Sequence, residues 1–170
     1  MLFEPNDENP RADTGGLVVR IYLDASTLNR PFDDHRLSRN RLEAEAVLAI
    51  LEWIETGKIE LISSAALVYE NMMSPLIERR EYVTTYLALA TTFVVTDPVL
   101  LQRAREFETQ GIRPLDALHL ASAERGHAAS FVTCDDRILK RARRGKLDTR
   151  LTIGTPVEFV ATRKKTNGQS

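Results

Sequence analysis

Residues 17–24, LVVRIYLD, are apolar except for Arg20 and for the aspartate that ends the run. Branched side chains are frequent in it, and successive apolar positions make both of its faces apolar. Strands that are buried on both faces of a parallel sheet have this composition. We therefore expect a buried strand that places Asp24 at its carboxyl end.

Strand-like and helix-like patterns alternate along the rest of the chain. Apolar residues recur at helical spacing from Leu42 to Ile54, up to a stop at Gly57. The other predicted strands are KIELIS (58–63), TTFVVT (91–96), SFVTC (130–134) and LTI (151–153). The other predicted helices run from a cap at Ser63 or Ser64 through Glu70, from Pro75 toward Ala90, from Asp97-Pro98 to Gly111, from Pro114 to Gly126, and from Arg137 to Arg144. This alternation predicts an α/β sandwich with a mainly parallel sheet.

The length and charge of the chain limit its class. Its 170 residues suit a single compact domain, expected over residues 17–162 between a flexible leader (1–16) and a frayed tail (163–170). The 23 lysines and arginines nearly balance 24 aspartates and glutamates, and the net charge of −1 excludes a generally polybasic mode of nucleic-acid binding. A local basic patch remains compatible with this balance.

Cysteine content and hydropathy exclude further classes. The single cysteine, Cys134, cannot form an intramolecular disulfide, and zinc clusters built from cysteine pairs are excluded. Its position in a predicted strand favours a small core residue over a nucleophile. No apolar run is long enough to cross a membrane, and the N-terminal stretch lacks the apolar core of a secretory signal. We therefore expect a cytoplasmic protein.

Four acidic residues from separate segments are expected near the carboxyl ends of the strands, where open α/β sheets bind ligands. They are Asp24 and Asp135 at strand ends, Asp116 in the first turn of a helix, and Glu70 on the helix that follows the second strand. Neighbouring carboxylates raise one another's pKa, and a hard divalent cation relieves this repulsion. Mg²⁺ or Mn²⁺ held by oxygen ligands is suited to phosphoryl transfer.

Each acid also has a purely structural interpretation. Asp24 is compatible with a turn, and Asp116 with an ordinary helix start. Glu70 is compatible with a solvated helix face, and three other glutamates compete for its role: Glu43, Glu45 and Glu52. The Asp135-Asp136 doublet also suits the N-terminus of a helix.

Neighbouring polar residues have two interpretations as well. Ser26 and Thr133 are expected either to hydrogen-bond the carboxylates or a bound water, or simply to cap backbone groups. His119 follows Asp116 by one helical turn and is either a metal ligand or base, or a histidine whose hydrogen bonds are satisfied in a half-buried setting.

A basic segment follows the last of these acids. On a helix, four cations share one face, while Ile138, Leu139 and Ala142 lie on the other: Arg137, Lys140, Arg141 and Arg144. This face is either a grip for RNA phosphates or a solvated charged surface.

The chain resembles the PIN domain, a family of small metal-dependent nucleases that includes the toxins of VapBC-type toxin–antitoxin pairs. The resemblance rests on Glu70 and on the segments IYLDAST (21–27), LDALHLASA (115–123) and FVTCDD (131–136). LNRPFDD (28–34) also resembles a loop of one bacterial branch, and TPVEFV (155–160) resembles the family's closing segment.

The resemblance implies a three-layer α/β/α sandwich, with Asp24, Glu70, Asp116 and Asp135 as catalytic and metal-binding residues. The Thr-x-Asp spacing favours Asp135 over Asp136, which is then expected beside the ligands. It also implies RNA cleavage with Mg²⁺ or Mn²⁺ and, often, inhibition by a partner protein.

Three functional interpretations therefore compete. The first is a metal-dependent endoribonuclease, either a toxin with a cognate antitoxin or a housekeeping RNA-processing enzyme. The second, phosphorylation of Asp24, lacks the nearby second aspartate and the strand-end lysine that such sites use. The third is a non-catalytic RNA- or protein-binding module on the same fold. A homodimer is also implied by the resemblance, with Tyr82, Tyr86 and Leu89 either at its interface or in the core.

Overall fold

The computed structural model describes residues 18–168 and contains a five-stranded, all-parallel sheet of order β3-β2-β1-β4-β5. The strands are β1 (Val19–Leu23), β2 (Ile59–Ser64), β3 (Thr92–Val94), β4 (Ser130–Val132) and β5 (Thr152–Gly154). Because β1 pairs with both β2 and β4, it lies in the middle of the sheet, and Ile21, Tyr22 and Leu23 are fully buried. The buried parallel strand predicted from LVVRIYLD is confirmed.

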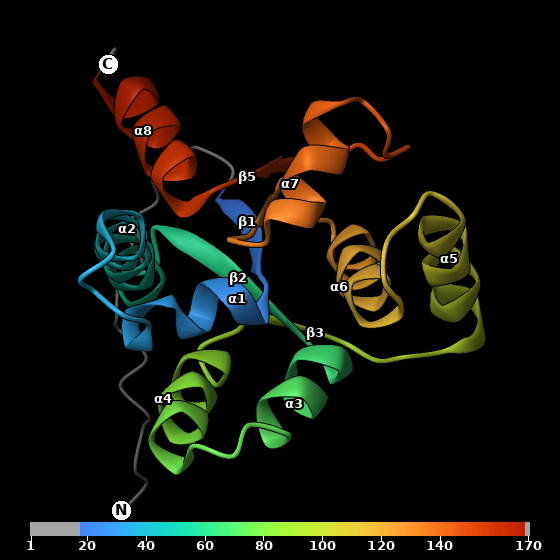
Figure 1. The fold of residues 1–170 in the computed structure, drawn as a ribbon, viewed down its shortest axis with the longest axis horizontal. Helices are drawn as coiled ribbons and strands as arrows, with labels where there is room; N and C mark the ends of the chain where they lie inside the picture. The colour runs from blue at the N-terminus through green and yellow to red at the C-terminus, as the bar shows by residue number, and fades with distance from the viewer. Residues whose placement is uncertain (1–17, 169–170) are drawn as a thin grey trace, which may run out of the picture.

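Helices cover both faces of the sheet and make the predicted three-layer α/β/α sandwich (Figure 1). They are α1 (Ala25–Asn29), the 3₁₀ turn η1 (Arg30–Phe32), α2 (Ser38–Glu55), α3 (Ala65–Met72), α4 (Ile77–Leu87), α5 (Pro98–Thr109), α6 (Pro114–Arg125), α7 (Asp136–Arg143) and α8 (Pro156–Asn167). In Figure 1, α2 and α8 lie on one side of the sheet, and α5 and α6 lie on the other. Within residues 18–168, no helix combines the length and the apolar character needed to cross a bilayer.

Local capping signals set several helix starts. Ser64, rather than Ser63, caps α3, and its hydroxyl accepts a hydrogen bond of 3.1 Å from the backbone N–H of Leu67. Asp97 caps α5 in the same way, accepting from Leu100 N at 2.8 Å, and Pro98 occupies the first helical position.

Three helical elements are not among those predicted, namely α1, η1 and α8, and the bounds of α4 differ from the prediction. The segment after Asp24 forms α1 and η1, which are too short to show an apolar period. The helix expected to begin at Pro75 starts at Ile77 instead, with Leu76 as its cap, and ends at Leu87.

The predicted frayed tail is wrong for residues 163–167, because α8 continues to Asn167. Thr155 and Glu158 form a reciprocal capping box that stabilises its start. Near its end, Arg163 donates to the carbonyl of Lys58 at 2.8 Å, and its guanidinium lies 5.5 Å from the ring centroid of Trp53. These contacts fix the helix against α2. The predicted leader (1–16) and residues 169–170 lie outside the described residues.

The aromatic residues of α4 pack inward. Phe32 lies edge-on to Tyr82, with ring centroids 4.8 Å apart, and Tyr82 lies edge-on to Tyr86 at 4.9 Å. Both tyrosines pack against the core, whereas Leu89 is 41% exposed. The core interpretation of the two tyrosines therefore accounts for their position.

Candidate active site

Asp24 is a buried carboxylate that follows β1 and caps α1. Its Oδ1 accepts from Ser26 Oγ at 2.7 Å and from the backbone N–H of Thr27 at 3.0 Å, and its Oδ2 accepts from Thr133 Oγ1 at 2.5 Å. Burial raises the pKa of Asp24, while these hydrogen bonds act in the opposite direction. The side chain is thus held in one orientation by donors from two strand ends.

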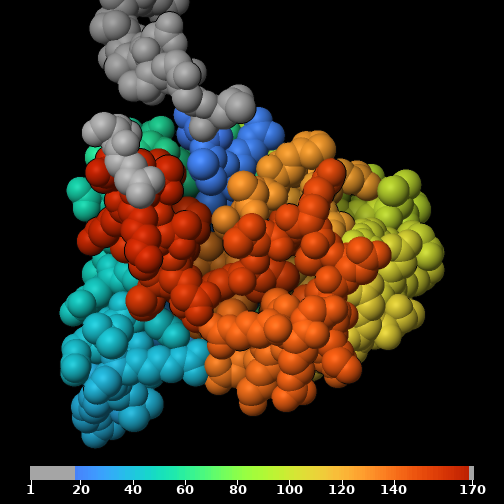
Figure 2. Space-filling view, turned by 90° about the horizontal axis from the view of Figure 1, so that it is seen from above, coloured from blue at the N-terminus to red at the C-terminus, as the bar shows by residue number. Residues whose placement is uncertain are grey.

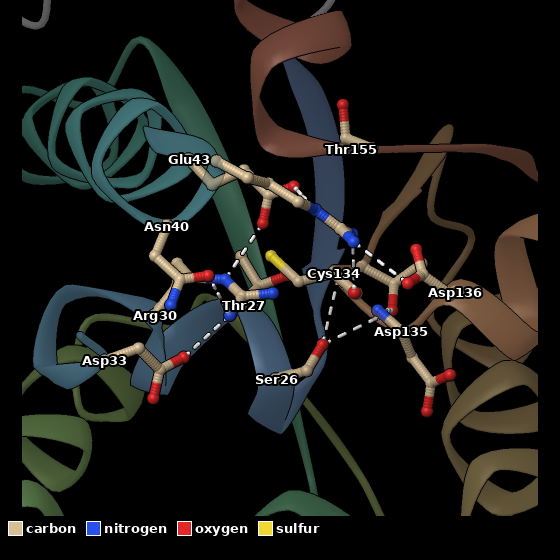
Figure 3. Close-up of polar contacts among 12 residues, drawn as sticks. Ser26, Thr27, Arg30, Asp33, Asn40, Glu43, Cys134, Asp135, Asp136 and Thr155 are labelled. Atoms are coloured by element: carbon tan, nitrogen blue, oxygen red, sulfur yellow. Dashed lines mark hydrogen bonds and ion pairs between the residues drawn. The ribbon is translucent and has the colours of Figure 1, made fainter. Parts of the chain in front are cut away.

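The same two hydroxyls hold the turn between β4 and α7. Ser26 Oγ accepts from the backbone N–H of Cys134 at 3.0 Å (Figure 3). Thr133 Oγ1 accepts from the backbone N–H of Asp135 at 3.0 Å. Asp135 then caps α7 through Arg137 N at 2.8 Å. Ser26 and Thr133 therefore connect Asp24 to the segment that carries Asp135, and their hydroxyls both hydrogen-bond the carboxylate and cap backbone groups.

Asp116 lies in the first turn of α6, where the charges of Asp135 and Asp24 act on it. Its pKa is raised by burial and then by the negative charges of Asp135 and Asp24. Arg113 opposes this effect: its guanidinium lies 3.5 Å from Asp116 Oδ2 and 3.8 Å from Asp135 Oδ2. The charges of Asp135 and Asp24 therefore act through space on Asp116.

Glu70 approaches the site from α3 and is bound to His119. Its Oε2 lies 2.6 Å from His119 Nε2, and His119 Nδ1 lies 2.7 Å from the hydroxyl of Tyr22. The Tyr22 pKa is raised well above its usual range, mainly by burial and further by the charges of Asp24 and Glu70. His119 is 1% exposed, and both of its ring nitrogens are hydrogen-bonded. Its position therefore agrees with the interpretation as a histidine whose hydrogen bonds are satisfied within the protein.

The chemistry of the acids is compatible with a hard divalent cation. As the side chains lie, no three histidine, cysteine, aspartate or glutamate residues within 18–168 converge closely enough to form a metal site. Asp24, Asp116 and Asp135 nevertheless offer only oxygen ligand atoms, and the raised pKa of Asp116 reflects burial and, after it, a repulsion by Asp135 and Asp24 that Mg²⁺ or Mn²⁺ relieves. By donor type and charge, these residues fit such a cation.

Asp136, predicted beside the ligands, faces a different set of residues. Its Oδ2 accepts from Arg39 Nη1 at 2.9 Å, and Arg39 also donates to the carbonyl of Cys134 at 3.2 Å and to Glu43 at 2.8 Å. Figure 3 shows Glu43, Cys134 and Asp136 around this position. Glu43 is 4% exposed and pairs with Arg30 at 2.9 Å as well. This cluster fixes the β4–α7 turn from the side of α2.

This cluster was not predicted from the sequence, in which Glu43 is only a competitor of Glu70. The signal that could have revealed it is the spacing of four residues between Arg39 and Glu43, which places both side chains on one helix face. The cluster also surrounds Cys134, whose thiol pKa is raised to about 12, chiefly by burial, so it stays protonated at neutral pH.

A cationic cavity of about 330 Å³ adjoins Asp116. The charged residues that line it besides Asp116 are Arg113, Arg137, Lys140, Arg141, Arg144 and Lys146. Arg141 is held by the carbonyl of Gln110 at 3.1 Å, and its guanidinium occupies the space that a side chain at Gly111 (φ 87°) would need. Figure 2 shows α7 and the loop after it, in orange, forming a broad part of one face between α8 and α5.

Comparison of the sequence with protein-family models identifies the family of the chain. The PIN domain family model matches residues 21–144, so the chain belongs to the PIN domain family, whose members are generally metal-dependent nucleases. No curated protein matches the chain. Among solved structures, the chain is similar to PAE2754 from Pyrobaculum aerophilum, with a TM-score of 0.51 and 19% identity over 89% of this chain and 92% of that one. At that identity the likeness concerns the fold alone.

Proposed function

We propose that this protein is an endoribonuclease that hydrolyses RNA phosphodiester bonds with Mg²⁺ or Mn²⁺. The observation that carries the proposal is the approach of Asp24, Asp116 and Asp135 from three segments, close enough for two of the charges to raise the pKa of the third. Membership of the PIN family supports a nuclease. Such a costly concentration of negative charge is expected where a cation binds.

Each residue of the site has a separate role in this proposal. Asp24, Asp116, Asp135 and, from the side of α3, Glu70 would hold the cation. When bound, a divalent cation would supply an activated water and stabilise the charge on the leaving oxygen. Ser26 and Thr133 keep Asp24 oriented, because their hydroxyls donate to its two oxygens. Arg113, 57% exposed at the edge of the site, is free to turn toward a phosphate when a cation takes its place.

The cationic cavity would hold the flanking phosphates. Arg137, Lys140, Arg141 and Arg144 line one cavity next to Asp116, as expected for the RNA-binding residues. Phosphate contacts contribute affinity without base specificity and are sensitive to salt. We expect Lys140→Glu with Arg144→Glu to weaken binding of all RNAs and to flatten its salt dependence. Lys164→Glu with Lys165→Glu, on the exposed part of α8, is the matched control.

The biological setting is proposed from the family alone. We infer a cytoplasmic toxin that is inhibited by a cognate antitoxin, and a housekeeping RNA-processing nuclease is the alternative. Co-expression with the protein encoded by the adjacent reading frame, followed by size-exclusion chromatography, tests this: co-elution supports a toxin–antitoxin pair, and separate peaks contradict it. The elution volume of the protein alone tests the homodimer.

Cleavage of structured RNAs tests the activity. The purified protein should cut them with Mg²⁺ or Mn²⁺, EDTA should abolish the cuts, and Asp24→Asn should remove them. Asp148→Asn, an exposed acid in the loop after α7, is the matched control and should cleave normally. Equal cleavage by Asp24→Asn would mean that another site or a contaminant is responsible.

Calorimetry with Mn²⁺ distinguishes an enzyme from a non-catalytic module. A nuclease should show Mn²⁺ binding heat that Asp24→Asn with Asp116→Asn removes. The absence of such heat in the wild-type protein would favour a binding module on the same fold.

A further inference from the structure

A second depression, of about 400 Å³, adjoins the candidate site at Ser26 and Glu70, whereas the cationic cavity adjoins it at Asp116. Its other main lining residues are Asn29, Arg30, Asp33, Pro75, Leu76 and Arg79. In Figure 3, Arg30 and Asp33 lie on one side of Ser26, and Asp135 lies on the other. The carboxylates therefore have a hollow on each flank.

The cationic cavity and the second depression differ in charge. The cationic cavity is lined by six cations and one acid. The second depression has two cations, Arg30 and Arg79, and two acids, Asp33 and Glu70. Arg30 and Arg79 both pair with Asp33, at 2.9 Å and 3.5 Å. The cationic cavity therefore has an excess of positive charge that attracts a phosphate, and the second depression does not.

The polar groups of the second depression are fixed before any ligand arrives. Arg79 donates to the carbonyl of Phe32 at 2.9 Å, and its guanidinium lies 5.6 Å from the centre of that ring. Arg30 also donates to Asn40 Oδ1 at 3.0 Å. Asp33 and Arg79 keep 29% and 27% of their side chains exposed, so both present hydrogen-bonding atoms at the surface.

Asn29 adds an acceptor to the set. Its amide N–H₂ donates to the carbonyl of Ala25 at 2.8 Å, which orients the amide, and no donor among residues 18–168 hydrogen-bonds its Oδ1. Beside it, Pro75 and Leu76, the latter 52% exposed, provide an apolar wall. A flat apolar ligand with donors and acceptors on its edge matches this combination.

We propose that this depression binds a nucleobase of single-stranded RNA next to the scissile bond and so confers base preference on cleavage. The proposal rests on the proposed nuclease function. Unstacked bases are recognised by stacking on apolar or guanidinium surfaces and by hydrogen bonds to their edges. Leu76 and Arg79 offer the stacking surfaces, while Asn29 and Asp33 contact the edge. The LNRPFDD segment, to which both belong, thereby has a role in specificity.

Binding of RNA octamers of A, C or U in EDTA tests the proposal without requiring cleavage. The wild-type protein should prefer one homopolymer by about tenfold, the discrimination that one good base contact provides. Leu76→Trp fills the depression and Asn29→Ala removes its acceptor, so each should abolish the preference. Leu48→Trp, an exposed leucine of α2, should retain it. Thermal unfolding checks that all variants are folded.

The outcomes separate this proposal from the nuclease function. Equal affinity of the wild-type protein for the three octamers, or an unchanged preference in both folded depression variants, would overturn the subsite. Base-selective binding that both variants remove, in a wild-type protein that cuts no RNA, would support the subsite and overturn the nuclease function.

Discussion

Glu70 and His119 are joined by a contact of 2.6 Å between Oε2 and Nε2, which connects α3 to α6. A neutral imidazole that donates from Nε2 to the carboxylate accepts at Nδ1, and the hydroxyl of Tyr22 lies 2.7 Å from that atom. The Tyr22 oxygen also lies 2.7 Å from Ser64 Oγ. Glu70 is therefore oriented by a chain of buried groups that begins at the central strand and at the cap of its own helix.

Tyr22→Phe tests this chain. The ring can keep its stacking on Phe131, at 5.5 Å between centroids, but His119 Nδ1 loses its partner. We expect the free energy of unfolding to fall by about 1–3 kcal/mol, the cost of a buried group left without a partner. RNA cleavage should also fall, because Glu70 is less well oriented. Tyr69→Phe, at a 60% exposed position on α3, should change neither urea unfolding nor cleavage.

Asp116→Asn is expected to stabilise the protein at neutral pH in EDTA while abolishing cleavage. The folded-state pKa of Asp116 is raised, so its ionised form is disfavoured by burial and by Asp135 and Asp24. This cost is absent below the pKa of the unfolded chain and is complete above the folded-state pKa. The wild-type protein should therefore lose stability relative to the variant as the pH rises through that interval.

Thermal unfolding at acidic and neutral pH measures this difference. For a chain of this size, each kcal/mol corresponds to a shift of about 2–4 °C in Tm. A variant that melts at or below the wild-type temperature at neutral pH would contradict the electrostatic account.

Glu43→Gln should destabilise the protein strongly. The buried carboxylate lies between Arg30 and Arg39, and its neutralisation leaves two guanidinium groups without their common partner. Breaking a buried ion pair from one side typically costs about 3–5 kcal/mol. Because Arg39 also holds Cys134 O and Asp136, cleavage should fall as well. Urea unfolding measures the first effect, with Glu45→Gln, an exposed glutamate of the same helix, as a control within about 0.5 kcal/mol of wild type.

Thr133→Val tests whether cleavage depends on the hydroxyl that orients Asp24 rather than on the packing of the side chain. The change keeps the shape of a fully buried side chain but removes the donor to Asp24 Oδ2 and the acceptor for Asp135 N. Loss of a group that orients metal ligands typically costs about 10–100-fold in metal affinity or activity. We expect a decrease of that size in the cleavage rate, and Thr133→Ser should restore most of it. An equally inactive serine variant would point to packing rather than to the hydroxyl.

Short-range patterns predicted the elements well because their causes are local. The apolar run ending at Asp24, the caps at Ser64 and Asp97 and the proline at residue 98 act within a few residues of the chain. No helix was predicted over α8, and its end could not be predicted in this way, because Arg163 is held by Trp53 and Lys58, more than 100 residues away in sequence.

The order of strands and helices, and the four acids as a candidate set, were already apparent from the amino-acid sequence, because apolar periodicity and the position of an acid after a strand are properties of the linear chain. How those acids are arranged was settled only by folding. The charges of Asp135 and Asp24 act through space on Asp116, Glu70 is bound to His119, and Asp136 turns to Arg39. These outcomes depend on which distant side chains occupy the neighbouring space, since burial and charge act across distance rather than along the chain.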